Sequence, residues 1–356
     1  MAGSFTYANP PTIRWGAGST SELAGEVDRL GGRRVALITT RSICSDTALM
    51  ERLAATLAPC PPVVTLPISQ HAPLAQVERA AQEVSDAGAD VVVSVGGGSP
   101  IDAAKLIARL VADRRSSDAP SLPHVAVPTT LSTAELASGA GVTDAAGNKV
   151  GRRDPRMMPD SVIYDGALAL RTPIELWLST GIRALDHAVE GFLASGEHPL
   201  SDVLCLEAVR RLFRVLPAAR ADPASADVRT ECQIAAWLGY TLPGPTAAGL
   251  SHTMGKQIGA RHGIPHGVTS CLLLPHVMRY RATLQPDRLT ALAQATDGGQ
   301  GPLAAADDIH GLIASLGLPQ HLAAYGLGET ELRSAAEALA GEHSQADLLN
   351  IYQAAI

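Results

Sequence analysis

Three consecutive glycines, Gly96 to Gly98, could bind a ligand because they lie between an apolar run and a helical pattern. Glycine allows the backbone to approach a ligand closely, and the following helix offers free N–H groups at the positive end of its dipole. The turn therefore predicts a pyrophosphate site, although its spacing is not the GxGxxG of an ordinary Rossmann fingerprint. Ser99 and Asp102 could contact the same ligand. They could also only cap the helix, with Ser99 as N-cap, Pro100 in the first helical position and Asp102 as the capping-box partner.

A second group of polar side chains follows Pro128, where another apolar run ends. Thr129, Thr130 and Ser132 supply three hydroxyls within four residues. Nucleotides bind at the carboxyl edge of a parallel sheet, so we expect these hydroxyls to lie beside the glycine turn. A polar loop without a function is the alternative.

Basic side chains and histidines recur at helical spacing in the second half of the chain. Arg183 and His187 are four residues apart, as are His252 and Lys256, and His266 lies in a Pro/Gly turn. Residues four apart share one face of a helix. Neutral imidazole is the commonest metal ligand, so the three histidines could form a metal set. Taken singly, each could instead be an ordinary core or surface histidine.

The elements that position these residues follow from the apolar pattern. Short β-rich runs at 34–39, 63–66, 90–95 and 124–127 alternate with helical patterns at 47–57, 74–87 and 101–112. This alternation is typical of a parallel sheet covered on both faces. After Asp165 the pattern becomes Ala- and Leu-rich and helical, for example at 180–193 and 202–216. We therefore predict an α/β domain at 1–165 and an all-helical domain at 166–356, with an active site in the cleft between them.

The bulk composition excludes several classes of protein. The 356 residues suggest two domains, and the net charge of −7, without a basic run, argues against nucleic acid or an anionic membrane as partner. The N-terminus lacks a signal-peptide pattern, no apolar stretch could span a bilayer, and the five cysteines form no CxxC pair. We expect a cytoplasmic protein whose partner is a small-molecule substrate.

These motifs together resemble a known family. VVVSVGGGSPIDAAK is similar to the nucleotide loop of iron-containing alcohol dehydrogenases, and GIRALDHAVEG, GLSHTMGKQIGARHGIPHG and LLPHVM resemble that family's metal-binding region, in the same order. The resemblance covers nearly the whole chain. It implies a dehydroquinate synthase-like fold, α/β plus all-α, in which a nucleotide-binding parallel-sheet domain precedes a helical domain. It also implies NAD or NADP as cofactor and a homodimer.

The resemblance also implies a metal set of one aspartate and three histidines. The histidines match His187, His252 and His266, but the position of the aspartate is Arg183. A guanidinium cannot ligate a cation, and its charge repels one. Lys256 replaces a further histidine of the family, and Asp186 is turned away by about three residues of helix. We therefore expect no metal.

One branch of the family fits this departure. Maleylacetate reductases also lack the aspartate, and the segments at 149–165 and 70–74 resemble theirs. In that branch the replacement is usually asparagine, whereas GGGSPID follows the alcohol dehydrogenase pattern better. Arg183 and Lys256 match neither branch well, which leaves open a related reductase with a substrate of its own.

The expected reaction is hydride transfer from NAD(P)H to the carbonyl of a small, carboxylated substrate. Arg183, Lys256 and the three histidines would stabilise the developing alkoxide and bind the carboxylate, and His252 would deliver the proton. Arg183 could instead merely pair with Asp186 or Glu190 on its own helix. Arg41 could meet a 2′-phosphate, which favours acceptance of NADPH. The residues expected to contact the cofactor are Thr39, Arg41, Gly96, Gly97, Gly98, Ser99, Asp102, Thr129, Thr130, Ser132 and Lys149.

Two other functions remain open. The chain could be a metal-dependent alcohol dehydrogenase that holds iron or zinc with the three histidines and Asp186. It could also be a non-redox enzyme or a cofactor-binding regulatory protein, because one fold can host unrelated functions.

Overall fold

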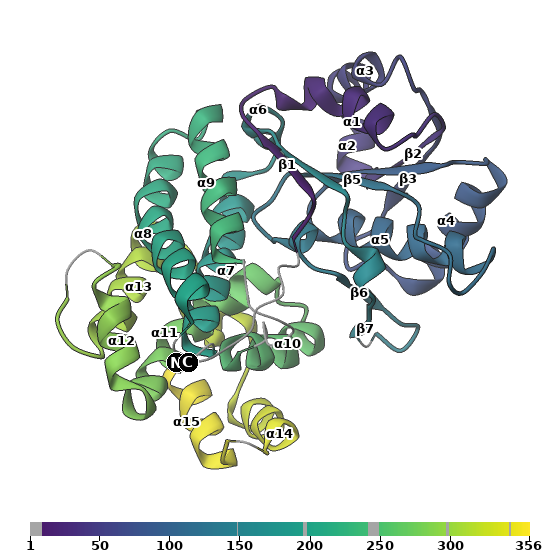
Figure 1. The fold of residues 1–356 in the computed structure, drawn as a ribbon. Coiled ribbons are helices and arrows are strands. Elements are labelled where there is room, and N and C mark those ends of the chain that lie inside the picture. The colour runs from purple at the N-terminus through teal and green to yellow at the C-terminus, as the bar shows by residue number, and fades with distance from the viewer. Residues whose placement is uncertain (1–8, 148, 195–197, 241–248, 297–298, 342) are drawn as a thin grey trace. The chain divides into compact units, whose positions relative to one another are not determined.

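The computed structural model describes residues 9–147, 149–194, 198–240, 249–296, 299–341 and 343–356. The chain divides into two compact units (Figure 1). The α/β unit contains Ala8–Thr172 and Ser225–Gln233, and the helical unit contains Pro173–Ala224 and Ile234–Ile356. None of the described helices is long and apolar enough to cross a membrane.

The α/β unit is built on a six-stranded sheet in which all paired strands are parallel, as predicted. Its strand order is β1-β8-β5-β4-β2-β3. The strands are β1 (Thr12–Trp15), β2 (Val35–Thr40), β3 (Pro62–Ile68), β4 (Val91–Gly96), β5 (His124–Pro128) and β8 (Ser161–Tyr164). Every residue of β4 is buried, which is expected of a central strand covered on both faces.

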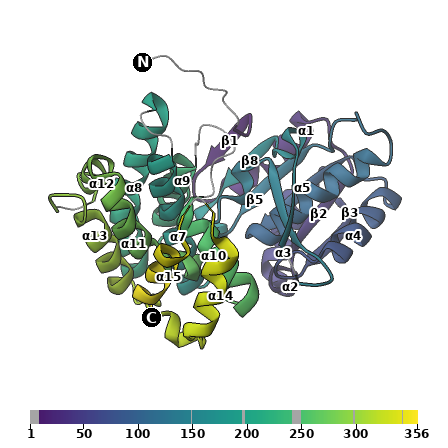
Figure 2. The same ribbon diagram turned by 90° about the horizontal axis from the view of Figure 1, so that it is seen from below.

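Helices cover the two faces of this sheet (Figures 1 and 2). Alternate residues of a strand point to opposite faces, so Ala36 and Ile38 join one apolar cluster while Val35 and Leu37 join the other. The first cluster includes side chains of α4 and α5, and the second includes side chains of α1 and α3. The helical elements of this unit are η1 (Ser19–Glu22), α1 (Leu23–Arg29), α2 (Arg41–Ser45), α3 (Thr47–Thr56), α4 (Leu74–Asp86), α5 (Gly98–Asp113), η2 (Ala134–Leu136), η3 (Pro155–Met157) and α6 (Gly166–Ala169).

The start of α5 corrects the predicted cap. The helix begins at Gly98 with Gly97 as its N-cap, whose φ of −81° and ψ of −161° are extended. Ser99 and Pro100 are therefore already helical, and Ser99 cannot be the N-cap. Its Oγ instead accepts a hydrogen bond of 3.0 Å from the backbone N–H of His71. An antiparallel hairpin of β6 (Gly139–Thr143) and β7 (Lys149–Arg153) was also not predicted.

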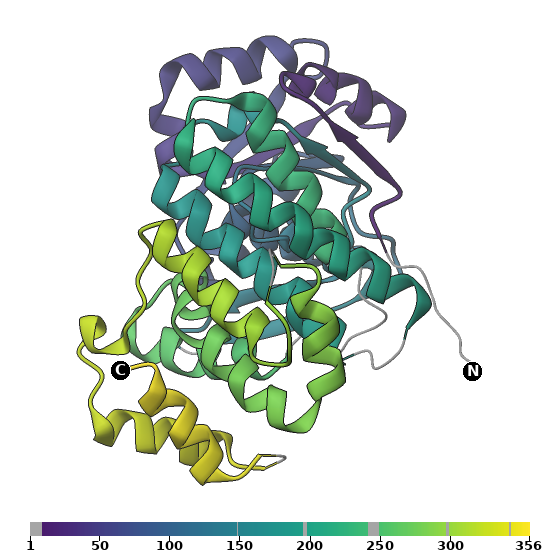
Figure 3. The same ribbon diagram turned by 90° about the vertical axis from the view of Figure 1, so that its left-hand side faces the viewer.

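The helical unit contains no strand among its described residues, in agreement with the sequence pattern. Helix α7 is buried along most of its length and packs against α8 and α11 (Figures 1 and 3). The residues of α9 (Ala226–Gly239) are divided between the two units. The other elements of this unit are α7 (Ile174–Ala194), α8 (Pro199–Ala221), α10 (Leu250–His262), α11 (His266–Leu284), α12 (Pro286–Ala293), α13 (Ala304–Ser315), η4 (Leu322–Tyr325), α14 (Glu329–Leu339) and α15 (Gln345–Ala354).

Candidate functional site

The sheet register brings the glycine turn and the hydroxyl-bearing turn together. Gly96 at the end of β4 pairs with Pro128 at the end of β5, and the Thr129 N–H donates to the Gly96 carbonyl at 2.9 Å. Strand β2 adjoins β4 on its other side and ends at Thr40. The cofactor residues expected after these three strands therefore lie along one edge of the sheet.

The glycine turn lies close to the hydroxyl-bearing turn, and its first residue requires glycine. Gly96 has a φ of +145°, and a Cβ there would lie 2.6 Å from Cγ of Pro100. A Cβ on Gly97 would lie 3.3 Å from Oγ1 of Thr130, and one on Gly98 would lie 3.3 Å from Oγ of Ser132. The absence of side chains at Gly97 and Gly98 thus lets the hydroxyl-bearing turn lie against the start of α5.

The hydroxyls of Thr130 and Ser132 are buried and have no hydrogen-bond partner among the described residues. A buried hydroxyl without a partner costs free energy that an incoming hydrogen-bonding group recovers. Unpaired donors beside a glycine turn at the start of α5 fit a phosphate group, whose oxygens accept hydrogen bonds. The residues present therefore fit a phosphate group, such as the diphosphate of a dinucleotide.

Two other residues expected to contact the cofactor, Thr39 and Asp102, bond to groups of the protein itself. Thr39 is buried, and its hydroxyl donates to the Val95 carbonyl at 2.8 Å, which ties β2 to β4. Asp102 forms an ion pair of 2.8 Å with Lys105, and its other oxygen accepts the Gly141 N–H at 3.0 Å. The Thr39 and Asp102 side chains therefore link neighbouring elements of the α/β unit.

Two basic residues expected at the cofactor lie near this edge. Arg41 is the first residue of α2 and is exposed. Lys149 begins β7, and its ammonium lies 3.6 Å from where a Cβ on Gly141 would be, close to the Asp102 carboxylate.

In the helical unit the structure brings the expected basic residues of α7 and α10 into contact. Arg183 Nη2 contacts both ring nitrogens of His252, at 2.9 Å for Nε2. The rings of His187 and His252 have centroids 5.7 Å apart, and His187 meets the edge of Tyr240 at 5.0 Å. Arg183 and His187, which were predicted to share one face of a helix, therefore both lie next to His252.

Arg183 has a buried counter-charge. Its Nη1 lies 3.3 Å from Oδ2 of Asp186 and donates to Ser270 Oγ at 3.0 Å. The same Asp186 oxygen accepts from the hydroxyls of Ser270 at 2.6 Å and Ser251 at 3.0 Å. Asp186 was expected to point away from the metal-ligand positions, and among the described residues it joins no group of three possible metal ligands; its carboxylate instead contacts Arg183. The pairing of Arg183 with Asp186, left open above, is present together with the contact to His252.

Glu190 is a site residue that sequence reasoning named only as a possible partner of Arg183. Its carboxylate accepts the backbone N–H groups of Ser251 at 2.6 Å and His252 at 3.3 Å. These lie in the first turn of α10, whose N-cap Gly249 has no side chain to satisfy them. Glu190 thus caps α10 from α7, and no local sequence signal reveals a cap from another helix.

The charges in this cluster shift its titration. Burial, followed by the charge of Arg183, lowers the pKa of His187 and of His252 well below the usual range. Lys256 and His266 also lower the pKa of His252, so their charges act on the same ring. A neutral ring that accepts a hydrogen bond from Arg183 has no imidazolium proton to release. The expected role of His252 as the proton donor therefore does not fit this arrangement.

The same cluster lacks the features of a divalent metal site. A metal binds the lone pair of an imidazole nitrogen, but the guanidinium of Arg183 is directed at the ring of His252. Within the described parts of the chain, no group of three His, Cys, Asp or Glu side chains is arranged to hold a metal ion. This arrangement of side chains does not fit a metal centre.

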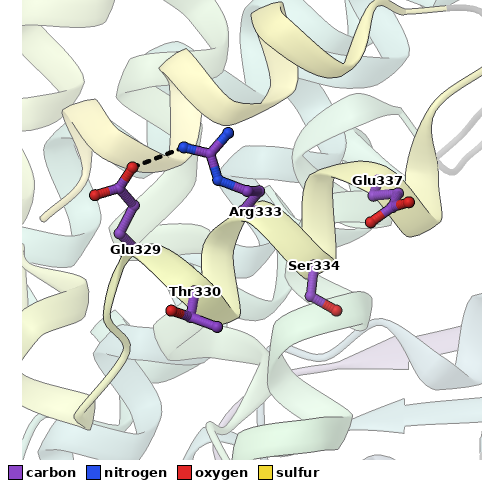
Figure 4. A pocket seen from close by; sticks show the side chains of 5 residues that line it. All are labelled: Glu329, Thr330, Arg333, Ser334 and Glu337. Atoms are coloured by element: carbon purple, nitrogen blue, oxygen red, sulfur yellow. Dashed lines mark hydrogen bonds and ion pairs between the residues drawn. The ribbon is translucent and has the colours of Figure 1, made fainter.

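An open depression lies along α14 (Figure 4). Its walls come from a single exposed helix face, and two of its residues, Glu329 and Arg333, already pair at 2.7 Å. It contains none of the expected site residues, and we assign no function to it. Its lining residues are Glu329, Thr330, Arg333, Ser334 and Glu337.

Comparison with known proteins covers almost the whole chain. The family model of iron-containing alcohol dehydrogenase matches residues 10–166, and the model of the Fe-containing alcohol dehydrogenase family, C-terminal, matches residues 177–355. Maleylacetate reductase of Rhizobium sp. is 33% identical over 334 residues, which are 94% of this chain and 90% of that relative. The crystal structure of maleylacetate reductase from Agrobacterium tumefaciens has a TM-score of 0.86 at 30% identity and covers 100% of this chain and 99% of its own. That of a 1,3-propanediol oxidoreductase has a TM-score of 0.91 at 26% identity, covering 99% and 100%.

Proposed function

Because the chain belongs to the iron-containing alcohol dehydrogenase family, we propose that it reduces the carbonyl group of a small carboxylated substrate without a metal ion. Its relatives make it an NAD(P)-dependent oxidoreductase that acts on CH–OH and C=O groups, in the maleylacetate reductase-like branch. The single observation that supports the finer proposal is the buried Arg183, which takes the place of a metal-ligating aspartate and contacts His252.

The reaction adds a hydride to the carbonyl carbon and a proton to its oxygen, and a reduced nicotinamide supplies the hydride when bound. The glycine turn, with the Thr130 and Ser132 hydroxyls, holds the diphosphate of the cofactor. Ser99 belongs to the same turn, although its hydroxyl is engaged by the His71 N–H.

Arg183 supplies the positive charge that a metal supplies in other members of the family. Its guanidinium lies against the neutral His252 ring and stabilises negative charge as it develops on the substrate oxygen. The neutral His252 ring has no imidazolium proton to release. We therefore assign the proton on the product to solvent water.

The substrate carboxylate requires a second cation, because both terminal nitrogens of Arg183 already have partners. Lys256 is exposed on α10, one helical turn after His252, and a flexible ammonium pairs readily with a carboxylate. We assign the carboxylate to Lys256. A keto acid such as maleylacetate meets these requirements.

The test is oxidation of NADH and of NADPH by the purified protein with maleylacetate, before and after exhaustive chelation. We expect turnover with maleylacetate to survive chelation unchanged, because Arg183 supplies the charge. Acetaldehyde and propanal serve as uncharged controls, and we expect at least a tenfold lower kcat/KM for them because Lys256 has no carboxylate to bind.

Activity that is lost on chelation and restored by iron or zinc would contradict the metal-free site. It would instead support an alcohol dehydrogenase that uses His187, His252 and His266. If maleylacetate and the uncharged aldehydes were turned over equally well, only the role assigned to Lys256 would be contradicted.

A further inference from the structure

Thr133 has a backbone conformation that β-branched residues rarely adopt. Its φ is +57° and its ψ is 18°, in the left-handed region, and the residue is only 1% exposed. A Cβ-branched side chain in this region costs free energy, so the surrounding structure must hold the residue there. Thr133 directly follows Ser132, one of the two buried hydroxyls that lack a partner among the described residues.

The group that holds this turn is the ammonium of Lys105, a fully buried side chain of α5. It donates to the carbonyls of Ala134 at 2.9 Å, Ala137 at 3.2 Å and Gly139, and it pairs with Asp102. A buried ammonium is tolerated only with such a set of partners. All three carbonyls belong to the six residues that follow Thr133. The Lys105 side chain therefore bonds to the segment 134–139 at both of its ends and in between.

Two further contacts anchor this segment and the strand that follows it. The Tyr164 hydroxyl on β8 donates to Glu135 Oε1 at 3.0 Å. Asp102, which pairs with Lys105, accepts the Gly141 N–H on β6 at 3.0 Å. The turn is thus fixed on α5, β6 and β8, while its other end carries the hydroxyls that face Gly97 and Gly98.

We propose that Lys105 is a positioning residue for the dinucleotide, because it holds Thr133 in the left-handed conformation and so fixes the Thr130 and Ser132 hydroxyls against the glycine turn. The identity of the ligand rests on the proposed function, whereas the positioning does not. Lys105 itself touches no reacting atom. Its ammonium is enclosed by protein carbonyls and the Asp102 carboxylate.

The test compares Lys105→Met with Arg109→Met. Arg109 is a matched control because its side chain is equally buried on α5 but bonds to Asp113 and to the Ala119 carbonyl, outside the segment 134–139. Two quantities are measured: amide hydrogen exchange of the segment without cofactor, and dissociation constants of NADH and NADPH from nucleotide fluorescence.

Lys105→Met is expected to raise the exchange rates of the Leu136 and Ala137 amides at least tenfold, because their hydrogen bonds to Thr133 and Ala134 depend on the turn. It is also expected to weaken NADH binding about tenfold, which corresponds to about 1.4 kcal/mol. Adding Thr133→Gly removes the cost of the left-handed conformation and should recover at least threefold of that loss. Arg109→Met should change neither quantity more than twofold.

Unchanged exchange in Lys105→Met, or equal loss of binding in both single variants, overturns the proposal. If Lys105→Met does not fold, Lys105→Gln replaces it, because its amide can still donate two hydrogen bonds; an exchange increase of at least threefold is then expected, and none overturns the proposal. A wild-type protein that binds neither nucleotide refutes the proposed function, while the exchange rates still decide the positioning role.

Discussion

Arg183 has two terminal nitrogens with separate partners, and this division determines what the residue can do. One nitrogen contacts Asp186 and Ser270, and the other contacts His252. The guanidinium is therefore held between a buried carboxylate and an imidazole. The fixed position suits a charge that polarises a neighbour, because a preorganised charge needs no rearrangement when negative charge develops on a substrate.

Replacing Asp186 by Asn tests this division at the level of one residue. The amide keeps the shape of the side chain but removes the negative charge that holds Arg183, so we expect kcat for the carbonyl substrate to fall at least tenfold. The dissociation constant of NADH should change less than twofold. Steady-state kinetics and nucleotide titration measure the two effects.

Ser251→Ala is the matched control, because it removes one hydrogen bond to Asp186 but no contact of Arg183. Its kcat should fall less than threefold. Equal losses in both variants would mean that Asp186 acts only in packing.

At the level of the elements, the strong apolar runs predicted the central strands, and the weak ones did not. Strand β4 and helix α4 match the predicted 90–95 and 74–87 within one residue. Strands β1 and β8 were missed: each has only four residues, and β1 (TIRW) has no apolar run because Thr12 and Arg14 alternate with Ile13 and Trp15. The hairpin β6–β7 was missed because Gly139, Gly141 and Gly151 interrupt its apolar alternation.

Local sequence patterns predicted part of the candidate site, as they predicted the central strands. Residues four apart on α7 and the turns after β4 and β5 follow from local spacing. Two interactions were not predictable in this way: Glu190 on α7 caps α10, and Lys105 on α5 bonds to the turn after β5. Each connects elements that are separate in the sequence, and no local pattern encodes such a contact.

The start of α11 supplies a prediction at this scale. Helices α11 and α7 pack so closely at Gly267 that a Cβ there would lie 2.7 Å from the Ser179 carbonyl carbon and oxygen. Backbone atoms cannot move aside as a side chain can, so Gly267→Ala must displace the first turn of α11 and with it His266. We expect a loss of about 2 kcal/mol in the free energy of unfolding, the range of an overpacked core.

Gly311→Ala on α13 is the control, because no atom lies within 4 Å of the new Cβ. There we expect a gain of up to about 1 kcal/mol from the better helix propensity of alanine. Urea unfolding of both variants measures the difference, and a Gly267→Ala protein as stable as wild type would mean that the two helices can separate without cost.

The stability of the whole molecule should depend on pH through Glu135. Burial is the largest cause that raises the pKa of Glu135, from 4.5 to about 7, and the hydrogen bond from Tyr164 and the charge of Lys105 oppose it, while Asp102 adds to it. The folded state therefore keeps this proton to a higher pH than the unfolded chain. Stability associated with Glu135 is fully present below about pH 4.5 and is lost as pH rises through 7.

The comparison with Glu135→Gln isolates this effect, because the other carboxylates are common to both proteins. Between pH 5 and pH 8, the free energy of unfolding of wild type should fall by about 2.5 kcal/mol relative to the variant. Urea titrations at the two pH values measure the change. An identical pH dependence in both proteins would show that Glu135 titrates as an ordinary carboxylate.

The burial of Arg183 has a consequence for the supply of active molecules in a cell. A guanidinium is part of the chain, so every folded copy carries its charge, whereas a bound ion distributes itself between copies according to its concentration. The guanidinium does not dissociate on dilution, and air does not oxidise it, whereas air oxidises ferrous iron. The charge beside His252 is therefore independent of iron starvation and of oxygen, and every folded copy of the chain carries it.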